Sequence, residues 1–482
     1  MVVAALAAVG PIAEGAIGQG RGWTIGLLLM LIAPSLARAG GPRFHPMDPE
    51  TYIPACYFLS TGYTPLLGIL KSADFSLSTR DAAAMQLAYA GAIGCALACT
   101  ALSRVWEPPN VERMVPLRSP RALLDQDWGA IAVGAVGLAL VGAWLASVGL
   151  GRIMTVDYGA THLEEDGKGL LTSGWYLIRF ALVYCFLRFA SLRKVGLPAP
   201  KVLLLVGACL LGSILFQTMM GRRGPLVWTA LSIVLAFHAY GIQLRRLWLA
   251  VGVVGALFYG VALEGARAQQ GRGFDAQIAS AILHLEQKNL LEVNEFERVY
   301  DNIVIVANDR PPILEYPGES WINAALILVP RPVWGERPLA VSQRYVNWIA
   351  PDFARHGGGF AMNAAAEGFL NLGLLGAGIE VAVFCALFFM HPINVAAGRD
   401  TPLLIRTGGA CLTSFAYNQF RGELTGVLKI TVSLGIALLG ALLFTTVVRH
   451  LRRRLSVLGP SRRRPLRNLR NTRLGQPSTP GG

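Results

Sequence analysis

Long apolar runs separated by short polar breaks make up most of the chain. Runs near 20 residues recur, which is the length a helix needs to cross a bilayer. Regular alternation of the kind found in transmembrane β-barrels is missing from the sequence. The pattern predicts an all-α polytopic membrane protein with about twelve transmembrane helices. The predicted spans are 2–18, 23–37, 52–70, 82–103, 128–150, 172–190, 201–220, 224–241, 247–263, 366–390, 403–419 and 424–448.

One polar interruption, 264–365, is too long to be a simple connector. It divides the chain into spans one to nine over 1–263, this large loop, spans ten to twelve over 366–448, and a basic tail over 449–482. In the first half of the loop, "AQIASAILHLEQKNLL" and "VNEFERVYDNIVIVAND" have the apolar periodicity of amphipathic helices. "WINAALILVP" predicts a short apolar helix that is too short to span.

Composition agrees with the membrane class, since 53% of the residues are hydrophobic and only 15% are charged. The formal net charge is +14, and the tail over 449–482 carries ten arginines without any Asp or Glu. Because cytoplasmic segments are enriched in Lys and Arg, the tail predicts a cytoplasmic C-terminus and places 264–365 on the outer side. We favour this anchoring role of the tail over nucleic-acid binding or lipid-specific binding.

The turn "GRRGPL" departs from that trend, because its two arginines, Arg222 and Arg223, fall on the outer side. Gly221 ends one predicted helix, and Pro225 suits the first position of the next. A helix N-terminus beside two guanidinium groups favours an anion. We interpret the turn as an anion site, with snorkelling to lipid headgroups as the alternative.

Further cations fall at a similar level of the predicted membrane. Arg179 is predicted inside the sixth span, Arg421 in the short outer turn "QFRGEL", and Lys429 inside the last span. Charges within spans usually face a cavity and carry function. Glu380, in the tenth span, is a candidate partner for one of them, and a structural ion pair is the competing interpretation.

The second half of the loop combines arginines with aromatic residues. Arg331 and Arg337 alternate with Trp334, Tyr345 and Trp348, and such faces suit phosphates and sugar rings. An interfacial aromatic belt is the competing interpretation.

Two titratable residues follow at the end of the loop. His356 lies in the flexible turn "RHGGGF", and Glu367 opens the tenth span. Both are acid–base candidates, against a surface histidine and a glutamate that stabilises a helix N-terminus.

Some chemistries leave no trace in the sequence. A nucleotide-binding P-loop pattern is missing, and no cluster of His, Cys or Asp has metal-ligand spacing, so we expect neither a cofactor nor a metal. The seven cysteines all fall in apolar runs, which favours small buried residues over disulfides or metal ligands.

The block from Glu319 to Gly376 resembles the oligosaccharide repeat-unit polymerases, or Wzy family, of O-antigen and capsule synthesis. The residues that carry the resemblance are "LVPRPVWGERP" and "AAAEGFLNLGLLGAG", with "GRRGPL" and "FRGEL" as further similar turns. Direct likeness covers roughly a fifth of the chain. Ala366 and Glu336 are departures from the expected pattern.

The resemblance implies a glycosyltransferase C-like fold in the bacterial inner membrane. It implies transfer of a glycan from undecaprenyl diphosphate to another lipid-linked repeat unit at the outer face, without metal or nucleotide sugar. Lipid and undecaprenyl-diphosphate-linked oligosaccharides would be partners, with a chain-length regulator and a flippase as further candidates.

In this reading Glu367, His356 and Arg331 are catalytic candidates, and the anion-binding candidates are Arg222, Arg223, Arg337, Arg421 and Arg179. Trp334, Tyr345 and Trp348 would contact sugar. An O-antigen ligase, a transporter or flippase of lipid-linked sugars, and a structural scaffold stay open as alternatives.

Overall fold

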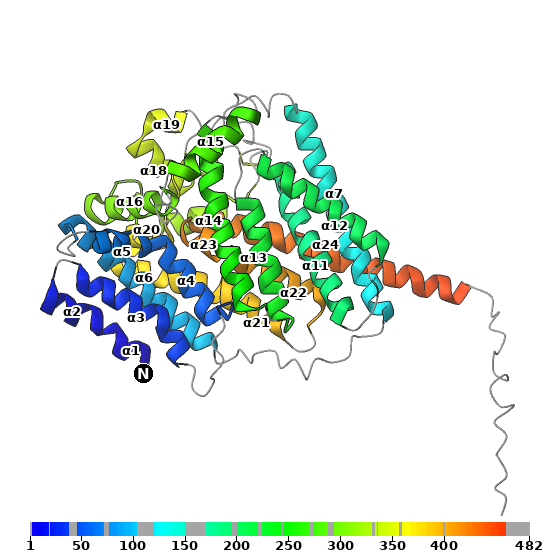
Figure 1. Cartoon of the computed structure of the whole chain (residues 1–482), viewed down its shortest axis with the longest axis horizontal. Coiled ribbons are helices and arrows are strands. Elements are labelled where there is room, and N and C mark those ends of the chain that lie inside the picture. Colours follow the sequence, from blue (N-terminus) through cyan, green and yellow to red (C-terminus); the bar gives the residue numbers. More distant parts are fainter. Residues whose placement is uncertain are drawn as a thin grey trace, which may run out of the picture.

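The computed structural model of the chain is built from helices, and every regular element among the described residues is helical (Figure 1). The described residues are 2–18, 20–37, 46–71, 77–103, 120–149, 169–194, 198, 200–219, 224–242, 244–268, 274–287, 294–329, 333–334, 336–355, 359–398 and 401–458.

The helices in chain order are α1 (Val2–Ala7), α2 (Val9–Ile17), α3 (Arg21–Ala37), α4 (Pro49–Thr61), α5 (Tyr63–Lys71), α6 (Thr79–Ser103), α7 (Pro120–Val148), α10 (Gly169–Thr172), α11 (Gly174–Lys194), α12 (Lys201–Met219), α13 (Gly224–Ala239), α14 (Arg246–Ala268), α15 (Phe274–Gln287), α16 (Asn294–Asp309), α17 (Glu319–Leu326), α18 (Val341–Ile349), α19 (Pro351–Arg355), α20 (Ala364–Val383), η2 (Phe384–Met390), α21 (His391–Ala397), α22 (Leu403–Ser414), α23 (Ala416–Phe420) and α24 (Leu424–Leu458).

Six helical segments in the described part of the chain are long and apolar enough to cross a membrane. They are Thr79–Ser103, Leu124–Val148, Gly174–Arg193, Leu247–Ala266, Ala364–Ala397 and Leu424–Leu455. A seventh crossing is counted if α4 and α5, which meet at 60°, form one bent span. The prediction of helices is therefore confirmed for the predicted spans, but the structure supports fewer full-length crossings than twelve, because several of these helices are short or broken.

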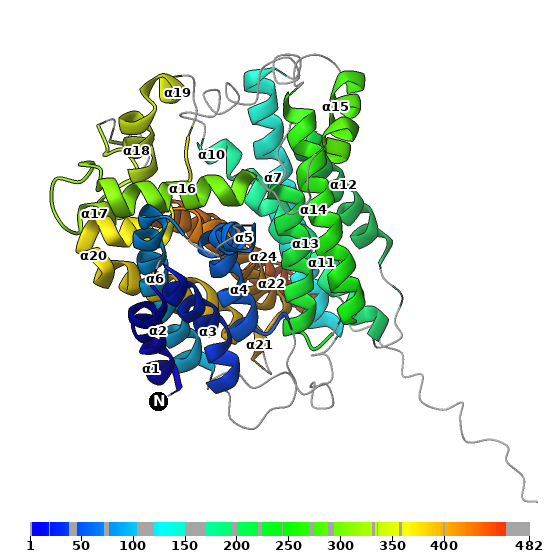
Figure 2. The same ribbon diagram turned by 60° about the vertical axis from the view of Figure 1, so that its left-hand side comes forward.

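The helices of the large loop are also confirmed. α15 and α16 occupy the two amphipathic segments, and α17 covers most of the short apolar one. Figures 1 and 2 show α16, α18 and α19 together on one side of the molecule, near α6 and α20. α7 and α11 to α14 form the opposite side in both views. These three loop helices thus lie over one part of the bundle, whereas α15 packs against α14.

Two main apolar cores hold the helices together. The larger one spans both sides and joins residues of α1, α3, α4, α6, α7, α11, α13, α16, α18, α20, η2 and α22 to α24. The smaller one joins α7, α11 and α12 around Trp144 and Trp175, whose rings meet edge to face 6.4 Å apart. A buried ion pair also links α7 to α11, because Arg188 donates from Nε to Oδ1 of Asp127 at 2.9 Å.

Polar contacts group the ends of several helices at one end of the bundle, which we call the basic end. Arg452 of α24 pairs with Asp125 of α7 at 2.7 Å. Arg406 of α22 donates to the carbonyl of Ala239, at the end of α13. The distribution of arginines in the sequence assigns these same helix ends to one side of the membrane, the cytoplasmic side.

The other end of the bundle carries the loop helices. Tyr300 of α16 donates to Asp81 of α6 at 3.1 Å, and Ser342 of α18 donates to Glu423 before α24. This end, which we call the loop end, holds the segments that the sequence groups on the outer side.

α20 consists of two helical arms separated by a break. The backbone leaves the helical region at Leu372 and Gly373, and Gly373 has φ of 63°. The chain then folds back, and a Cβ placed on Gly368 would lie 2.4 Å from the carbonyl oxygen of Gly376. In a straight helix these two residues would be about 12 Å apart along the axis. The predicted tenth span therefore starts with a short helix that turns back at the loop end, and a crossing can begin only after Gly373.

Candidate functional site

The hairpin of α20 holds Glu367 in the interior of the loop end. Its side chain is fully buried, and Oε2 accepts a hydrogen bond of 2.7 Å from the backbone N–H of Leu424, the first residue of α24. A carboxylate at a helix N-terminus is favoured by the helix dipole. The other oxygen, Oε1, has no hydrogen-bond partner among the described residues. One oxygen therefore has a backbone donor, and the other makes no hydrogen bond within the described part of the chain.

The return arm of the hairpin places Glu380 beside Glu367. The two carboxyl groups interact directly, although they are thirteen positions apart in the chain. Glu380 also accepts a hydrogen bond of 2.7 Å from Nε1 of Trp321 in α17. The fold-back at Gly373 is what makes this pair possible, since a continuous helix would separate the groups by about 20 Å.

Asn371 fixes the turn of the hairpin against α17. Its side chain accepts from the N–H of Gly318, donates 2.7 Å to the hydroxyl of Ser320, and donates to the carbonyl of Glu367. Because Asn371 is buried, its bonds to Ser320 and to the carbonyl of Glu367 form away from water. The Asn and Gly of "FLNLG" thus have a clear structural use: one anchors the turn and the other adopts the left-handed backbone.

A third buried carboxylate, Glu319 of α17, is held by a cation. Arg344 of α18 donates to Glu319 Oε1 at 2.5 Å, and the N–H of Glu315 donates to Oε2 at 2.6 Å. Burial opposes ionisation, but these donors together hold the pKa of Glu319 below its ordinary value. This pair joins α17 to α18 and so fixes the helices over the α20 hairpin.

Glu423 completes a group of three carboxylates, Glu367, Glu380 and Glu423, which we call the carboxylate cluster. It accepts from both the N–H and the hydroxyl of Ser342 at the start of α18, at 2.7 and 2.8 Å. Burial, and then the charge of Glu367, raise the pKa of Glu423 to about 7. A carboxyl group with such a pKa can exchange a proton at neutral pH.

Arg179 lies in α11 and is the other unusual buried charge. Only 4% of the residue is exposed, and its guanidinium lies 4.7 Å from the ring centre of Phe415 and 5.7 Å from that of Tyr176. Nε and Nη1 have no hydrogen-bond acceptor among the described residues. Two unused donors on a buried cation are costly, so the site favours an anionic acceptor.

Aromatic side chains connect Arg179 to the loop end. Trp228, one turn into α13, lies 6.0 Å from Phe415 and stacks 5.8 Å from Tyr417. Tyr417 in turn meets Phe296 of α16 at 5.6 Å. This row of rings lies next to the start of α13 at Gly224 and Pro225, where the sequence predicts a helix start after the "GRR" turn.

Four predicted site residues lie outside the described residues: Arg222, Arg223, Arg331 and His356. Two other predicted cations are described. Arg337 donates from Nη1 to the carbonyls of Ile327 and Val329, so it holds the chain after α17. Arg421 is half-buried at the end of α23, two residues before Glu423. Arg421 is thus a neighbour of Glu423 in sequence, and Arg337 has a structural contact.

The three predicted sugar-binding aromatics differ in exposure. Trp334 and Trp348 are 37% and 42% exposed, so their rings are accessible. Tyr345 is fully buried, and its hydroxyl donates to Asn302 Oδ1 at 3.1 Å. Its ring also packs near Trp348 and Phe360, which favours a packing role for Tyr345.

Sequence reasoning did not select Glu423 or Ser342, although "FRGEL" contains Glu423. The signal was an acidic residue immediately before a long apolar helix, which is a common capping position. It also missed Arg406, whose guanidinium donates to the carbonyls of Thr401, Ala239, Ala396 and Gly398. Arg406 is a satisfied structural arginine and contrasts with Arg179.

Taken together, the loop end offers carboxyl groups that can take up a proton, and α11 offers a cation with unused donors. Segment 415–424 connects them, because Phe415 contacts Arg179 and Leu424 contacts Glu367. Comparison with known protein families, with characterised proteins and with solved structures gives no match to this chain.

Proposed function

We propose that the chain is a membrane glycosyltransferase that polymerises undecaprenyl-diphosphate-linked oligosaccharide repeat units at the outer face of a bacterial inner membrane. The loop end, with the carboxylate cluster, would face outward, and the C-terminus would be cytoplasmic. The resemblance of Glu319 to Gly376 motivates the proposal. Full-length spans beyond the six or seven apolar helices, and a glycosyltransferase C-like fold, belong to this proposal as well.

One observation carries the proposal most: two of the segments that resemble the polymerases, "AAAEGFLNLGLLGAG" and "FRGEL", meet around a single buried polar group. Glu367 lies in the first and Glu423 in the second, Glu380 follows the first by two residues, and Trp321 lies near the start of the resembling block. Motifs some hundred residues apart at their extremes thus share one set of contacts. A purely structural scaffold would not need ionisable groups there, because apolar packing at similar volume is at least as stable.

The proposed chemistry assigns separate roles to the carboxylates and to Arg179. Transfer needs a base to take the proton of the acceptor hydroxyl, and Glu367, through Oε1, or Glu423, with its pKa of about 7, would serve. The diphosphate leaves with its charge neutralised by guanidinium groups. Arg179 supplies unused N–H donors for that purpose, and Arg222 and Arg223 are further candidates from the sequence.

The direct test reconstitutes the full chain in lipid nanodiscs with undecaprenyl-diphosphate-linked repeat units and no nucleotide sugar. We expect a ladder of longer glycans on the lipid. Glu367→Gln should reduce chain extension by roughly 100-fold or more while the protein accumulates normally. Glu336→Gln, at an exposed loop position, is the matched control and should extend chains at the wild-type rate. A normal ladder from Glu367→Gln would remove Glu367 as the base.

An O-antigen ligase would use the same donor, so the acceptor decides between the two. Adding lipid A core to the same nanodiscs gives that comparison. A single transfer to the core, with no ladder on the lipid diphosphate, would replace polymerase by ligase.

A transporter of lipid-linked oligosaccharides is a second candidate, and the broken helices favour it. α20 breaks at Gly373, α4 meets α5 at 60°, and α22 meets α23 at Phe415. Discontinuous helices around ionisable residues are typical of transport sites. Movement of a lipid-linked glycan across a vesicle membrane, with no change in its mass, would support the transporter and contradict the polymerase.

A further inference from the structure

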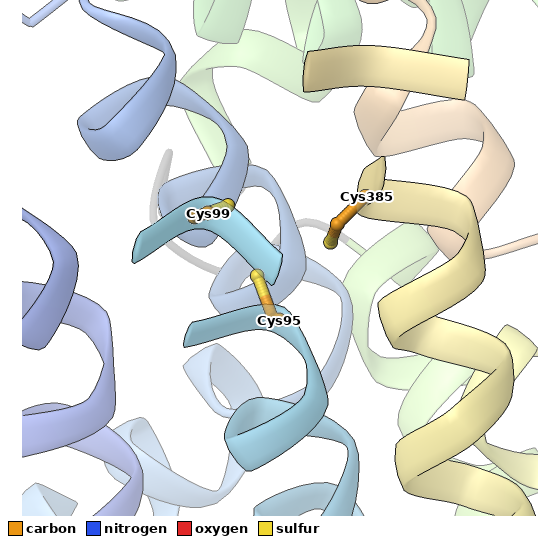
Figure 3. A group of neighbouring side chains, drawn as sticks. All are labelled: Cys95, Cys99 and Cys385. Carbon is orange, nitrogen blue, oxygen red and sulfur yellow. The ribbon is translucent and has the colours of Figure 1, made fainter. Parts of the chain in front are cut away.

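Three buried cysteines converge between α6 and η2, and the proposed glycosyl transfer has no use for them. Cys95 and Cys99 are one turn apart on α6, and Cys385 is the second residue of η2. Their sulfur atoms all lie within 4.8 Å of one another, and at most 2% of any of the three residues is exposed. Figure 3 shows the three side chains pointing toward a common point from two elements.

The backbone around this group, which we call the thiol triad, is held closely. A Cβ placed on Gly94 would lie 2.0 Å from the carbonyl oxygen of Gly378, so α6 and the return arm of α20 are in direct backbone contact one residue before Cys95. On the other side of the triad, Asn394 of α21 donates to the carbonyl of Leu102. The helix α6 is therefore held against the α20–η2–α21 stretch on both sides of the thiol triad, at Gly94 and at Leu102.

The local geometry of η2 also contributes. Phe384–Met390 is a π-helix within an otherwise α-helical stretch, and its wider turn changes which side chains face a neighbouring helix. Single π turns are frequent at functional sites, because they are rarely the most stable local choice. In this chain the π segment carries the third cysteine.

The donor set selects the ligand chemistry. Within the described residues the group contains only sulfur atoms, with no histidine nitrogen or carboxylate oxygen. Zinc in proteins is almost always four-coordinate, and a three-sulfur group leaves it one ligand short. Monovalent copper prefers soft sulfur ligands.

We propose that Cys95, Cys99 and Cys385 form a three-coordinate binding site for one Cu(I) ion. Each thiol that becomes a thiolate ligand releases its proton, and no change of oxidation state is involved. The ion would tie α6 to η2 and so fix the return arm that carries Glu380.

The test uses the full chain, purified under reducing, anaerobic conditions in nanodiscs and titrated with Cu(I) against a colorimetric Cu(I) chelator. We expect one copper per chain, and X-ray absorption should give three sulfur neighbours and no nitrogen or oxygen. This spectroscopic result stands on the wild-type protein and needs no variant. Less than one copper per chain at saturation, or a mixed ligand shell, would overturn the proposal.

Variants then assign the ligands. Cys385→Ala should weaken Cu(I) binding by roughly 100-fold or more, since even indirect contacts to a metal ligand are worth about 10- to 100-fold. Cys185→Ala, buried in the separate α7–α11–α12 core, and Cys209→Ala, exposed on α12, are the matched controls and should bind like the wild type. Melting of metal-free protein shows whether Cys385→Ala still folds. Undiminished binding by folded Cys385→Ala, displacement of copper by equimolar Zn²⁺, or a disulfide within the triad would each contradict the site.

Discussion

Two buried arginines in neighbouring helices show how differently the same side chain can be accommodated. Arg406 bonds to four backbone carbonyls, whereas Arg179 has two N–H groups without an acceptor. A sequence reader sees only two arginines inside apolar runs. The difference depends on which carbonyls happen to lie nearby after folding, so charge pattern alone could select Arg179 but could not separate it from a structural residue.

The first prediction uses this contrast. Arg179→Met should keep or raise the thermal midpoint, because it removes a buried cation with unused donors; we expect a gain of about 1 kcal/mol in unfolding free energy. The same variant should abolish binding of a lipid diphosphate in nanodiscs, measured by calorimetry. Arg193→Met, at an exposed position of the same helix, should leave both quantities unchanged.

Arg406→Met is the opposing case. It removes the side-chain donor of four backbone carbonyls, two of them in fully buried hydrogen bonds, so the unfolding free energy should fall by about 3 kcal/mol or more. If Arg179→Met destabilised the protein as strongly as Arg406→Met, Arg179 would be a structural residue and the anion site would be lost.

Glu423 gives a pH prediction. Its pKa rises from an ordinary 4.5 to about 7 in the folded protein, through burial and then the charge of Glu367. The folded state therefore favours the protonated group. Its full stability is present below about pH 4.5 and is lost as the pH rises through 7, by an amount on the order of 3 kcal/mol.

The measurement is the thermal midpoint between pH 4.5 and 8 for the wild type and for Glu423→Gln. The neutral amide cannot ionise, so the variant should lose most of the slope over this window. Glu336→Gln should keep the wild-type slope, because that residue is exposed. A wild-type slope in Glu423→Gln would show that another group titrates.

At the scale of elements, the hydropathy pattern predicts correctly where helices form, but it does not predict where a helix breaks. All twelve predicted segments contain helix, and α13 begins at Gly224 and Pro225 as the turn signals indicate. A hydropathy average over twenty residues is insensitive to one Gly in a left-handed conformation. "FLNLG" did carry an Asn and a Gly, but only the packing of Asn371 on α17 explains why the chain turns there.

The glycines of the hairpin give an element-scale prediction. A Cβ on Gly376 would lie 2.0 Å from the carbonyl oxygen of Gly368, a backbone atom that cannot move away cheaply. Gly376→Ala should therefore lower the unfolding free energy by about 2 kcal/mol or more and open the hairpin. Gly255→Ala on α14, where a Cβ meets nothing within 4 Å, should instead stabilise the chain by about 0.5–1 kcal/mol.

Thermal midpoints of the two variants test this directly. A stabilising Gly376→Ala would mean that the two arms of α20 do not pack as described, and the contact between Glu367 and Glu380 would then lose its basis.

In the large loop, too, the sequence predicts where the helices form, but packing determines which side chains are exposed. Its amphipathic helices follow from apolar periodicity, and α15 and α16 form where that periodicity predicts them. The exposure of its aromatics does not follow from composition. Trp348 is accessible while Tyr345, three residues earlier and on the same helix, is fully buried.

At the scale of the whole molecule, two independent arguments group the same chain ends. The arginine-only tail predicts a shared side for the C-terminus, the turn after α11 and the turn after α13. In the structure Arg452 pairs with Asp125 near the start of α7, and Arg406 bonds to Ala239 at the end of α13. Asp125 lies two residues before Asp127, which pairs with Arg188 near the end of α11. The contacts thus show which helix ends lie together at one end of the bundle. The distribution of arginines predicts that this end faces the cytoplasm.

This grouping makes the last prediction, on topology. Reporter domains inserted at 243, at 196 and after the C-terminus should all report the cytoplasm, because the helix ends before these positions belong to the basic end. A reporter at 290, between α15 and α16 in sequence, should report the outer compartment. The prediction holds whether the protein has seven crossings or twelve, since it depends on the ends of individual helices and not on their total. An outer signal at 243 with a cytoplasmic signal at the C-terminus would contradict the grouping. The same compartment for 290 and the C-terminus would place the carboxylate cluster on the cytoplasmic side, and a lipid-linked donor at the outer face could not reach it.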